Sequence, residues 1–308
     1  MGLKVVFFGT PDFAVASLDA LVQNEFNVLA VVTAPDKPAG RGMQLQASAV
    51  KQYALEHQLR ILQPEKLKDP QFIATLQDLA ADVHIVVAFR MLPEVVWNMP
   101  KQGTINVHGS LLPQYRGAAP INWAIMNGET ETGVTTFRLK HQIDTGNILL
   151  QAKTPIFKED NFSTLYQRLM LLGAELLITT LRQLEAGTLQ EVPQDTIDET
   201  TLKHAPKLFK ENLQLDFNKP AAALVDFIRG LAPFPTAYTF LEHKQLKVFQ
   251  SHAVNELPSV AIGTMQTDAK SYIRFACKDA WLYIDELQLE GKKRMETVAF
   301  LRGFRFSE

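Results

Sequence analysis

Over the first 190 residues, short continuous apolar runs alternate with longer stretches in which apolar residues recur at every third or fourth position. Short apolar runs such as Val83–Ala88 and Gly103–His108 predict buried strands of a parallel sheet. Longer stretches such as Ala47–His57 and Ser163–Glu185 place apolar residues three or four positions apart, as amphipathic helices do. This alternation predicts an α/β fold of Rossmann-like type, in which helices cover both faces of a mostly parallel sheet.

Further elements are predicted before and between these four. They are the strands Lys4–Phe8, Asn27–Thr33, Gly133–Leu139 and Ile148–Ile156 and the helices Asp12–Leu21, Pro70–Leu79 and Pro120–Asn127. Asp12 is expected to cap the first of these helices. Between Ala34 and Gly42 the chain holds two prolines and two glycines in nine residues. That density of helix and strand breakers predicts irregular structure there.

The pattern changes after a polar stretch at Gly187–Thr201, which has little apolar periodicity and is interpreted as a linker. A helix near Ala221–Gly230 precedes five short strands at spacings typical of a small antiparallel barrel. These strands are predicted near Ala237–Leu241, Leu246–Ala253, Gly263–Thr267, Tyr272–Ala276 and Trp281–Leu289. The predicted organisation is therefore an α/β domain at 1–189, a linker at 190–205 and an OB-like domain at 206–308.

Composition is that of an ordinary globular protein, with 46% hydrophobic and 21% charged residues. The single cysteine, Cys277, excludes an internal disulfide and fits a reducing compartment. No apolar run reaches the roughly 18 residues of a membrane span, and the first strand begins almost at the amino terminus. A cytoplasmic protein with no membrane partner is expected, and we expect a monomer.

Charge is distributed unevenly along the chain. Residues 201–308 hold 15 Lys and Arg against 12 Asp and Glu, a net charge of +3, whereas residues 1–200 carry −5. A basic appendage on an acidic body suits a polyanionic substrate, although a solvated surface has the same composition.

Three common kinds of site are excluded by their missing motifs. The first strand is followed by Gly9-Thr10-Pro11, which is not the glycine pattern of a dinucleotide-binding turn, and no P-loop is present. The seven histidines do not fall at the spacings of zinc ligands. We therefore expect no catalytic metal.

Candidate chemistry gathers where the strand at Gly103–His108 ends. Asn106 and His108 are two residues apart in a strand, so both side chains project from the same face. An amide beside an imidazole can donate hydrogen bonds to an oxygen that becomes anionic during acyl transfer. Asp144, in the sharp turn Gln142–Gly146 between two predicted strands, is the best carboxylate to join them, although aspartates in turns more often bond their own backbone.

These residues lie in motifs by which the chain resembles the 10-formyltetrahydrofolate-dependent formyltransferases, essentially from end to end. The loop at 35–42 and the last domain resemble most closely the members that act on an aminoacylated tRNA. The motifs are Phe8–Ala14, Pro35–Gly42, Asn106–Pro120, Ile143–Gly146, Lys292–Met295 and Phe300–Gly303.

The resemblance implies roles for individual residues. The catalytic Asn, His and Asp of the family fall on Asn106, His108 and Asp144. The folate-binding segment of the family falls on Ser110, Leu111, Leu112 and Pro113. Contact with the tRNA is implied for a loop arginine and a basic cluster in the last domain, namely Arg41, Lys292, Lys293 and Arg294.

The implied reaction moves the formyl group of 10-formyltetrahydrofolate to the α-amino group of initiator methionyl-tRNA. Asn106 and His108 would stabilise the formyl oxygen as it becomes negative, and Asp144 would orient His108 and handle the proton of the amine. One departure concerns the folate pocket, where many members have a Tyr-Gly step and this chain has Phe89-Arg90-Met91.

Two other functions remain open at this stage. The same site could formylate a small amine, such as a purine precursor or an amino sugar, although such an acceptor requires neither the 35–42 loop nor a basic last domain. A noncatalytic ligand-binding module would leave the set of Asn106, His108 and Asp144 unexplained.

Overall fold

The computed structural model describes residues 2–39, 44–194 and 199–306, and the chain forms two compact units. Unit 1 consists of residues up to Arg116, Thr132–Thr154 and Tyr166–Lys203. Unit 2 consists of Gly117–Glu131, Pro155–Leu165 and the residues from His204 onward. Each unit is described by itself below.

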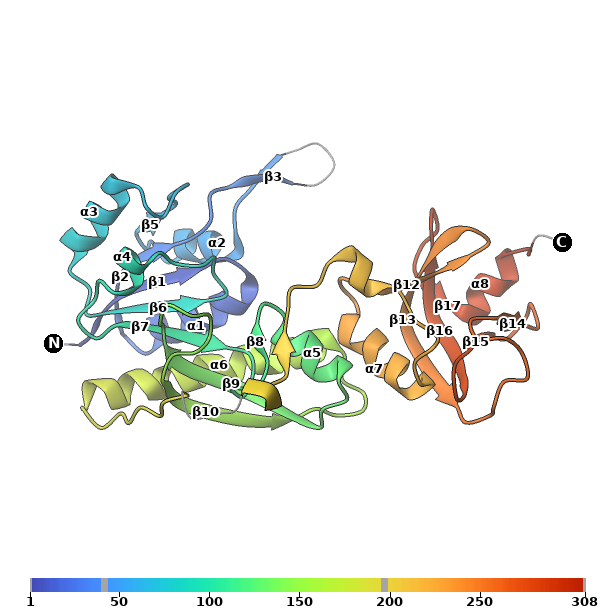
Figure 1. Ribbon diagram of the computed structural model, residues 1–308. Coiled ribbons are helices and arrows are strands. Elements are labelled where there is room, and N and C mark those ends of the chain that lie inside the picture. The colour runs from blue at the N-terminus through green and yellow to red at the C-terminus, as the bar shows by residue number, and fades with distance from the viewer. Residues whose placement is uncertain (1, 40–43, 195–198, 307–308) are drawn as a thin grey trace. The chain divides into compact units, whose positions relative to one another are not determined.

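Unit 1 is built on a seven-stranded sheet with the order β10-β9-β7-β6-β1-β2-β5 (Figure 1). The strands β1, β2, β5, β6 and β7 run parallel, and β9 is antiparallel to β7. The sheet strands are β1 (Lys4–Gly9), β2 (Asn27–Val32), β5 (Ile61–Leu62), β6 (Val83–Val87), β7 (Thr104–His108), β9 (Glu131–Arg138) and β10 (Ile148–Pro155). The predicted α/β architecture with a mostly parallel sheet is confirmed.

Helices cover both faces of this sheet, which explains why its central strands are apolar on both sides. They are α1 (Asp12–Gln23), α2 (Ala49–Glu56), α3 (Pro70–Leu79), α4 (Glu94–Trp97) and α6 (Phe162–Glu185), with a 3₁₀ turn at Glu199–Thr201. A Cβ added to Gly173 of α6 would lie 3.0 Å from Val107 of β7, so α6 packs closely on that face. On the opposite face, Phe8 and Val86 share a buried cluster with Phe72 of α3 and Val96 of α4.

Several helix ends follow from local chemistry. The Asp69 carboxylate accepts hydrogen bonds from the backbone N–H groups of Gln71 and Phe72, and Pro70 occupies the first turn, so α3 begins where the sequence predicts. The prediction for α1 was wrong in one detail. Asp12 is its first residue rather than its cap, because Pro11 holds the extended capping position and has no side-chain acceptor.

The segment after β2 also differs from the prediction of irregular structure. Residues Lys37–Ala39 form β3, which pairs with β4 (Gln44–Gln46) in an antiparallel two-stranded arm (Figure 1). Pro38 is compatible with this arm because a two-stranded ribbon has free edges, where a missing N–H group leaves no partner unpaired.

Unit 2 contains the antiparallel sheet predicted for the second part of the chain, an OB-like curled sheet with the order β12-β13-β16-β15-β14 and β17 paired to β16. Its elements are α5 (Pro120–Met126), β11 (His204–Ala205), a 3₁₀ turn (Lys210–Leu213), α7 (Ala221–Leu231), β12 (Ala237–Leu241), β13 (Lys244–Val254), β14 (Met265–Thr267), β15 (Ile273–Ala276), β16 (Trp281–Leu289), β17 (Met295–Glu296) and α8 (Thr297–Gly303). The short strand β8 (Arg116–Gly117) lies at the boundary of the two units. The core of unit 2 includes Leu224 and Ile228 of α7, Leu282 of β16 and Phe300 of α8.

His84 of β6 makes the stability of unit 1 sensitive to acid. It is 1% exposed beside the ring of Phe8, and burial lowers the pKa of its imidazole from 6.5 to about 4. The folded protein therefore keeps His84 neutral, whereas the unfolded chain binds a proton below pH 6.5, so stability present above that pH is lost as the pH falls toward 4. The shift corresponds to at most about 3 kcal/mol of unfolding free energy.

We expect His84→Leu to remove this dependence. Urea unfolding of the wild-type protein and of the variant at pH 7 and at pH 4.5 gives the comparison. The wild-type protein should lose more unfolding free energy between the two pH values than the variant loses. Equal losses would mean that other groups cause the acid sensitivity.

Candidate active site

Strand β7 presents the predicted amide and imidazole on one face of the sheet. Within Thr104–His108, Ile105 and Val107 point to the face covered by α6, so Asn106 and His108 point to the other. Asn106 is half-buried, and its carboxamide has no hydrogen-bond partner among the described residues. His108 is 7% exposed and lies edge-on to the Phe137 ring of β9. An uncommitted amide therefore stands two residues from a buried imidazole.

The two ring nitrogens of His108 face different partners. Nε2 lies 2.9 Å from the backbone oxygen of Tyr115, and a carbonyl can only accept, so Nε2 carries the hydrogen of the neutral ring. Nδ1 lies 3.8 Å from Oδ2 of Asp144, which is 9% exposed. That separation is longer than a hydrogen bond, so Nδ1 is the ring atom that remains available for a reacting group.

Asp144 reaches His108 from the loop between β9 and β10, and this loop is tightly constrained. Strand β9 ends at Arg138, opposite Ile105, so the loop must fold back along the sheet to bring Asp144 to His108. Asp144 itself has a left-handed backbone with φ of 57°, which aspartate tolerates better than most residues. A Cβ at Gly146 would lie 1.6 Å from the Arg138 carbonyl oxygen, so only glycine fits there. The structure thus brings together His108 and Asp144, which lie 36 residues apart.

The segment Ser110–Pro113 directly follows β7 and is held by Thr135 of β9. The Thr135 hydroxyl donates to the Ser110 oxygen at 2.7 Å and accepts from the Leu112 N–H at 3.1 Å. Gln151 of β10 donates to the Leu112 oxygen at 2.8 Å, and the buried Ser110 hydroxyl donates to the oxygen of Gln114. These bonds fix the backbone of the predicted folate-binding turn, while Leu111 stays partly exposed.

Residues 88–91, where the sequence departs from the common family pattern, follow the neighbouring strand β6. Phe89 packs against Phe8, with the ring centroids 5.8 Å apart. The Arg90 guanidinium donates to the backbone oxygens of Pro64 and Glu65. Met91 is 73% exposed. The arginine is therefore used to hold a neighbouring loop, and an exposed apolar side chain remains beside the end of β6.

Gln194 belongs to the candidate site, although nothing in the sequence pattern predicts this. It lies in the segment interpreted as a linker, yet it is only 2% exposed. Its amide nitrogen donates to the backbone oxygens of Asp144 at 3.2 Å and Gly146 at 2.6 Å. Its amide oxygen accepts two hydrogen bonds from Arg116. No hydrophobic periodicity marks this position, so only the three-dimensional contacts identify it.

The basic residues predicted to contact tRNA have different environments. Lys292 and Lys293 are exposed in the turn between β16 and β17. Arg294 makes two hydrogen bonds with the Glu286 carboxylate, at 2.7 and 2.5 Å, and its guanidinium lies 4.2 Å from the centre of the Phe249 ring. Arg41 falls outside the described residues. The two lysines are therefore the charges in this cluster that are most accessible to a phosphate.

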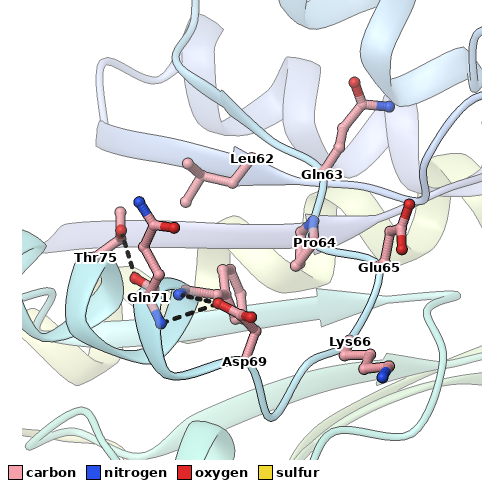
Figure 2. A pocket seen from close by; sticks show the side chains of 9 residues that line it. Leu62, Gln63, Pro64, Glu65, Lys66, Asp69, Gln71 and Thr75 are labelled. Carbon is pink, nitrogen blue, oxygen red and sulfur yellow. Dashed lines mark hydrogen bonds between the residues drawn. The ribbon is translucent and has the colours of Figure 1, made fainter.

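An open pocket of about 520 Å³ in unit 1 lies away from these groups (Figure 2). It is formed by the loop after β5 and the start of α3, and its lining includes Gln63, Lys66, Asp69 and Gln71. Four strand spacings of about 4.8 Å, or roughly 19 Å, separate β5 from β7 in the sheet. This pocket is therefore separate from the groups around His108.

The described ranges hold neither a cluster of metal ligands nor a membrane-spanning helix. No group of three or more His, Cys, Asp or Glu residues is arranged to hold a metal ion there. None of the helices described is both long and apolar enough to cross a bilayer.

The arrangement around β7 is suited to reactions in which an oxygen becomes negative and a proton moves. The Asn106 amide can donate a hydrogen bond to such an oxygen. Nδ1 of His108 accepts a proton while the ring is neutral and donates one once it is protonated. The Asp144 carboxylate then lies close enough to stabilise the charged ring. Acyl transfer to an amine requires all three functions.

Both the first and the last part of the chain are similar in sequence to known proteins. A family model described as formyl transferase matches residues 3–181, and one described as formyl transferase, C-terminal domain, matches residues 207–305. Methionyl-tRNA formyltransferase of Bacteroides fragilis is 51% identical over 312 residues, covering 99% of this chain and 96% of that protein. Methionyl-tRNA formyltransferase of Parabacteroides distasonis is 52% identical, covering 98% and 96%.

A solved structure shares the fold. The N-formyltransferase from Helicobacter canadensis, in a complex with folinic acid and dTDP-3-aminofucose, has a TM-score of 0.65 at 21% identity. The match covers 92% of this chain and 99% of that one.

Proposed function

The chain belongs to the formyl transferase family, and from that premise we propose that it formylates the α-amino group of initiator methionyl-tRNA for translation initiation. The formyl donor is 10-formyltetrahydrofolate. The family resemblance found in the sequence is confirmed by the two family models and by relatives about half identical over nearly their whole length. Those relatives are named for the tRNA reaction, which favours it over formylation of a small amine.

The observation that carries the proposed chemistry is the approach of His108 Nδ1 to Asp144, on the face of β7 that also bears Asn106. An α-amino group has a pKa of about 7.7–8.0, so a large neutral fraction is ready to attack near neutral pH. Asn106 donates to the formyl oxygen as the amine adds to its carbon. Nδ1 of His108 takes the proton that the amine must lose, and Asp144 stabilises the resulting imidazolium. As the bond between the formyl carbon and N10 of the folate breaks, the imidazolium returns this proton to N10, which leaves as the neutral amine of tetrahydrofolate.

The donor molecule would be held at the carboxyl ends of β6 and β7. The turn Ser110–Pro113 offers backbone groups fixed by Thr135 together with the partly exposed Leu111. The neighbouring segment contributes the exposed side chain of Met91. Fixed polar backbone beside apolar side chains suits a flat ring that has hydrogen-bonding edges. The bound folate supplies the activated formyl group, and the protein supplies its orientation.

The tRNA would be held in part by Lys292 and Lys293. We expect the double variant Lys292→Ala/Lys293→Ala to raise KM for tRNA several-fold while kcat changes less than twofold. Each lost phosphate contact should also reduce the slope of log KM against log salt concentration by about 0.9. Initial rates between 50 and 300 mM salt give both quantities.

A second double variant, which removes the same number of positive charges from the same unit, provides the control. Lys270→Ala/Lys278→Ala removes two exposed lysines outside the cluster. It should leave KM and the salt slope close to the wild-type values. If both double variants change the slope equally, the effect belongs to net charge and the cluster has no special role.

A direct assay tests the proposed reaction. The purified protein is incubated with 10-formyltetrahydrofolate and methionyl-initiator tRNA, and formylmethionine is measured after mild hydrolysis of the ester. A small-amine acceptor, an amino sugar nucleotide or a purine precursor amine, is assayed in parallel. Formylation of the small amine but not of the tRNA would support the alternative function, and folate binding without any transfer would support a noncatalytic module.

We also propose that the enzyme works in the cytoplasm, where aminoacylated tRNA is used, and that one chain is sufficient for activity. Light scattering coupled to size-exclusion chromatography at assay concentrations tests the monomeric state.

A further inference from the structure

A closed ring of contacts connects His108 to Asp144 by a second route, besides their direct approach. It begins at His108, whose Nε2 donates to the Tyr115 backbone oxygen. The next residue, Arg116, donates from Nε at 3.3 Å and from Nη2 at 2.8 Å to Oε1 of Gln194. Nε2 of Gln194 then donates to the backbone oxygens of Asp144 and Gly146. The ring closes where Asp144 faces Nδ1 of His108.

Gln194 occupies the centre of this ring, and its amide is fully used. The oxygen accepts twice and the nitrogen donates twice, which is the complete capacity of a carboxamide. The side chain of Arg116 is also buried, at 10% exposure. Buried hydrogen bonds are costly to lose because water cannot replace the missing partner. The amide therefore joins the Arg116 guanidinium to the Asp144 turn.

The turn needs such support because it is strained and crowded. Asp144 has a left-handed backbone, and Gly146 lies in close contact with the Arg138 carbonyl. The two carbonyls that accept from Gln194 belong to these same two residues. Without a donor, the turn would lose the bonds that hold the Asp144 carboxylate toward His108.

The residues that precede Arg116 in the sequence are held by further hydrogen bonds, to Lys203. The Tyr115 N–H donates to the Lys203 oxygen at 2.6 Å, and the Gln114 side chain accepts from the Lys203 N–H at 2.8 Å. The segment that follows the long helix α6 thus holds the chain near His108 through Lys203 and the Asp144 turn through Gln194. This segment contributes to the active site, although its sequence is typical of a linker.

We propose that Gln194 is a positioning residue for formyl transfer: through its bonds to Arg116 and to the Asp144 turn, it sets the orientation of both His108 and the Asp144 carboxylate. The inference rests on the proposed function for the reaction itself, whereas the positioning can be measured without any substrate. Gln194 acts through Arg116 and through the turn of Asp144 and Gly146, without a contact of its own to either substrate.

Two variants of the full-length protein test the inference. Gln194→Leu removes all four hydrogen bonds. Gln194→Glu keeps the shape and the bonds from Arg116, but it replaces the donor to the two carbonyls with an acceptor. Thr180→Val is the matched control, because Thr180 is also fully buried in unit 1 and bonds Thr136 and Leu176 away from the ring.

We expect kcat to fall roughly 10- to 100-fold in both Gln194 variants, part of the effect of general-base catalysis. KM for each substrate should stay within threefold of the wild-type value. The ¹⁵N chemical shifts of the His108 ring, measured without substrate, should move in both variants because the ring loses its fixed orientation. Thr180→Val should lower the melting temperature while kcat stays within twofold and the His108 shifts remain unchanged.

The outcomes separate this inference from the proposed function. Wild-type kcat together with unchanged His108 shifts in Gln194→Glu would overturn it, and that variant decides the matter if Gln194→Leu does not fold. Moved His108 shifts in a protein whose wild type does not formylate methionyl-tRNA would overturn the proposed function but support the positioning role.

Discussion

Replacing Asn106 by alanine should lower kcat for formylation of methionyl-tRNA roughly 10²- to 10³-fold, with little change in KM for either substrate. The loss corresponds to about 2.7–4 kcal/mol, the usual effect of removing one donor from an oxyanion site. The reason lies in the position of the side chain. Asn106 is half-buried beside His108, and its amide is not committed to any described residue, so no internal hydrogen bond competes with the formyl oxygen. Single-turnover rates with saturating folate measure the chemical step.

An amide at the end of α1 is a suitable control. Asn24 donates to the Ala20 oxygen and accepts from Arg182, so its bonds lie at the carboxyl ends of α1 and α6 and involve no residue of the candidate site. Asn24→Ala should keep kcat within twofold of the wild-type value and cost at most some stability. If Asn106→Ala retained kcat within threefold, the formyl oxygen would have to be stabilised by another donor.

Asp144→Asn should lower kcat by roughly 10²- to 10⁴-fold, the range usually attributed to assisted proton transfer. Asparagine is the informative substitution because it accepts the left-handed backbone of this position, with φ of 57°, as readily as aspartate does. The variant therefore removes the charge and keeps the turn. Asp144→Ala would add backbone strain to the loss of charge, and the two effects could not be separated.

A second aspartate in unit 1 provides the comparison. Asp82 precedes β6 and accepts from the Lys4 N–H at 2.8 Å, at the opposite end of this strand from residues 88–91. Asp82→Asn should leave kcat within twofold. Steady-state kinetics of the two variants, with urea unfolding as a check on stability, separates a catalytic charge from a structural one. Equal activity of the two variants would remove Asp144 from the mechanism.

Most of the fold could be predicted because long elements have clear periods. Helix α3 begins and ends where the pattern predicts, and strands β6 and β7 end within a residue of their predicted bounds. Several short elements were missed, β5, α4 and α8 among them. Strand β5 has two residues, α4 has four and α8 has seven, too few for a hydrophobic period to be distinguished from chance.

The candidate site was predictable where its geometry is local. Strand alternation alone places Asn106 and His108 on one face of β7. Their approach to Asp144 depends on a loop that folds back from the end of β9, and neither propensity nor spacing describes such a path. Gln194 could not be found in this way, because its role consists of four hydrogen bonds to residues 48 to 78 positions away.

The distance along the chain between the members of the Gln194 ring has a consequence for synthesis on the ribosome. The nascent chain emerges from its amino end, so β7 and the Asp144 turn leave the exit tunnel well before residue 194. Until then the Asp144 and Gly146 carbonyls lack the donor that holds them in the folded protein. Completion of the proposed catalytic geometry is accordingly a late event of translation, and a product truncated before residue 194 lacks the amide that joins Arg116 to the Asp144 turn.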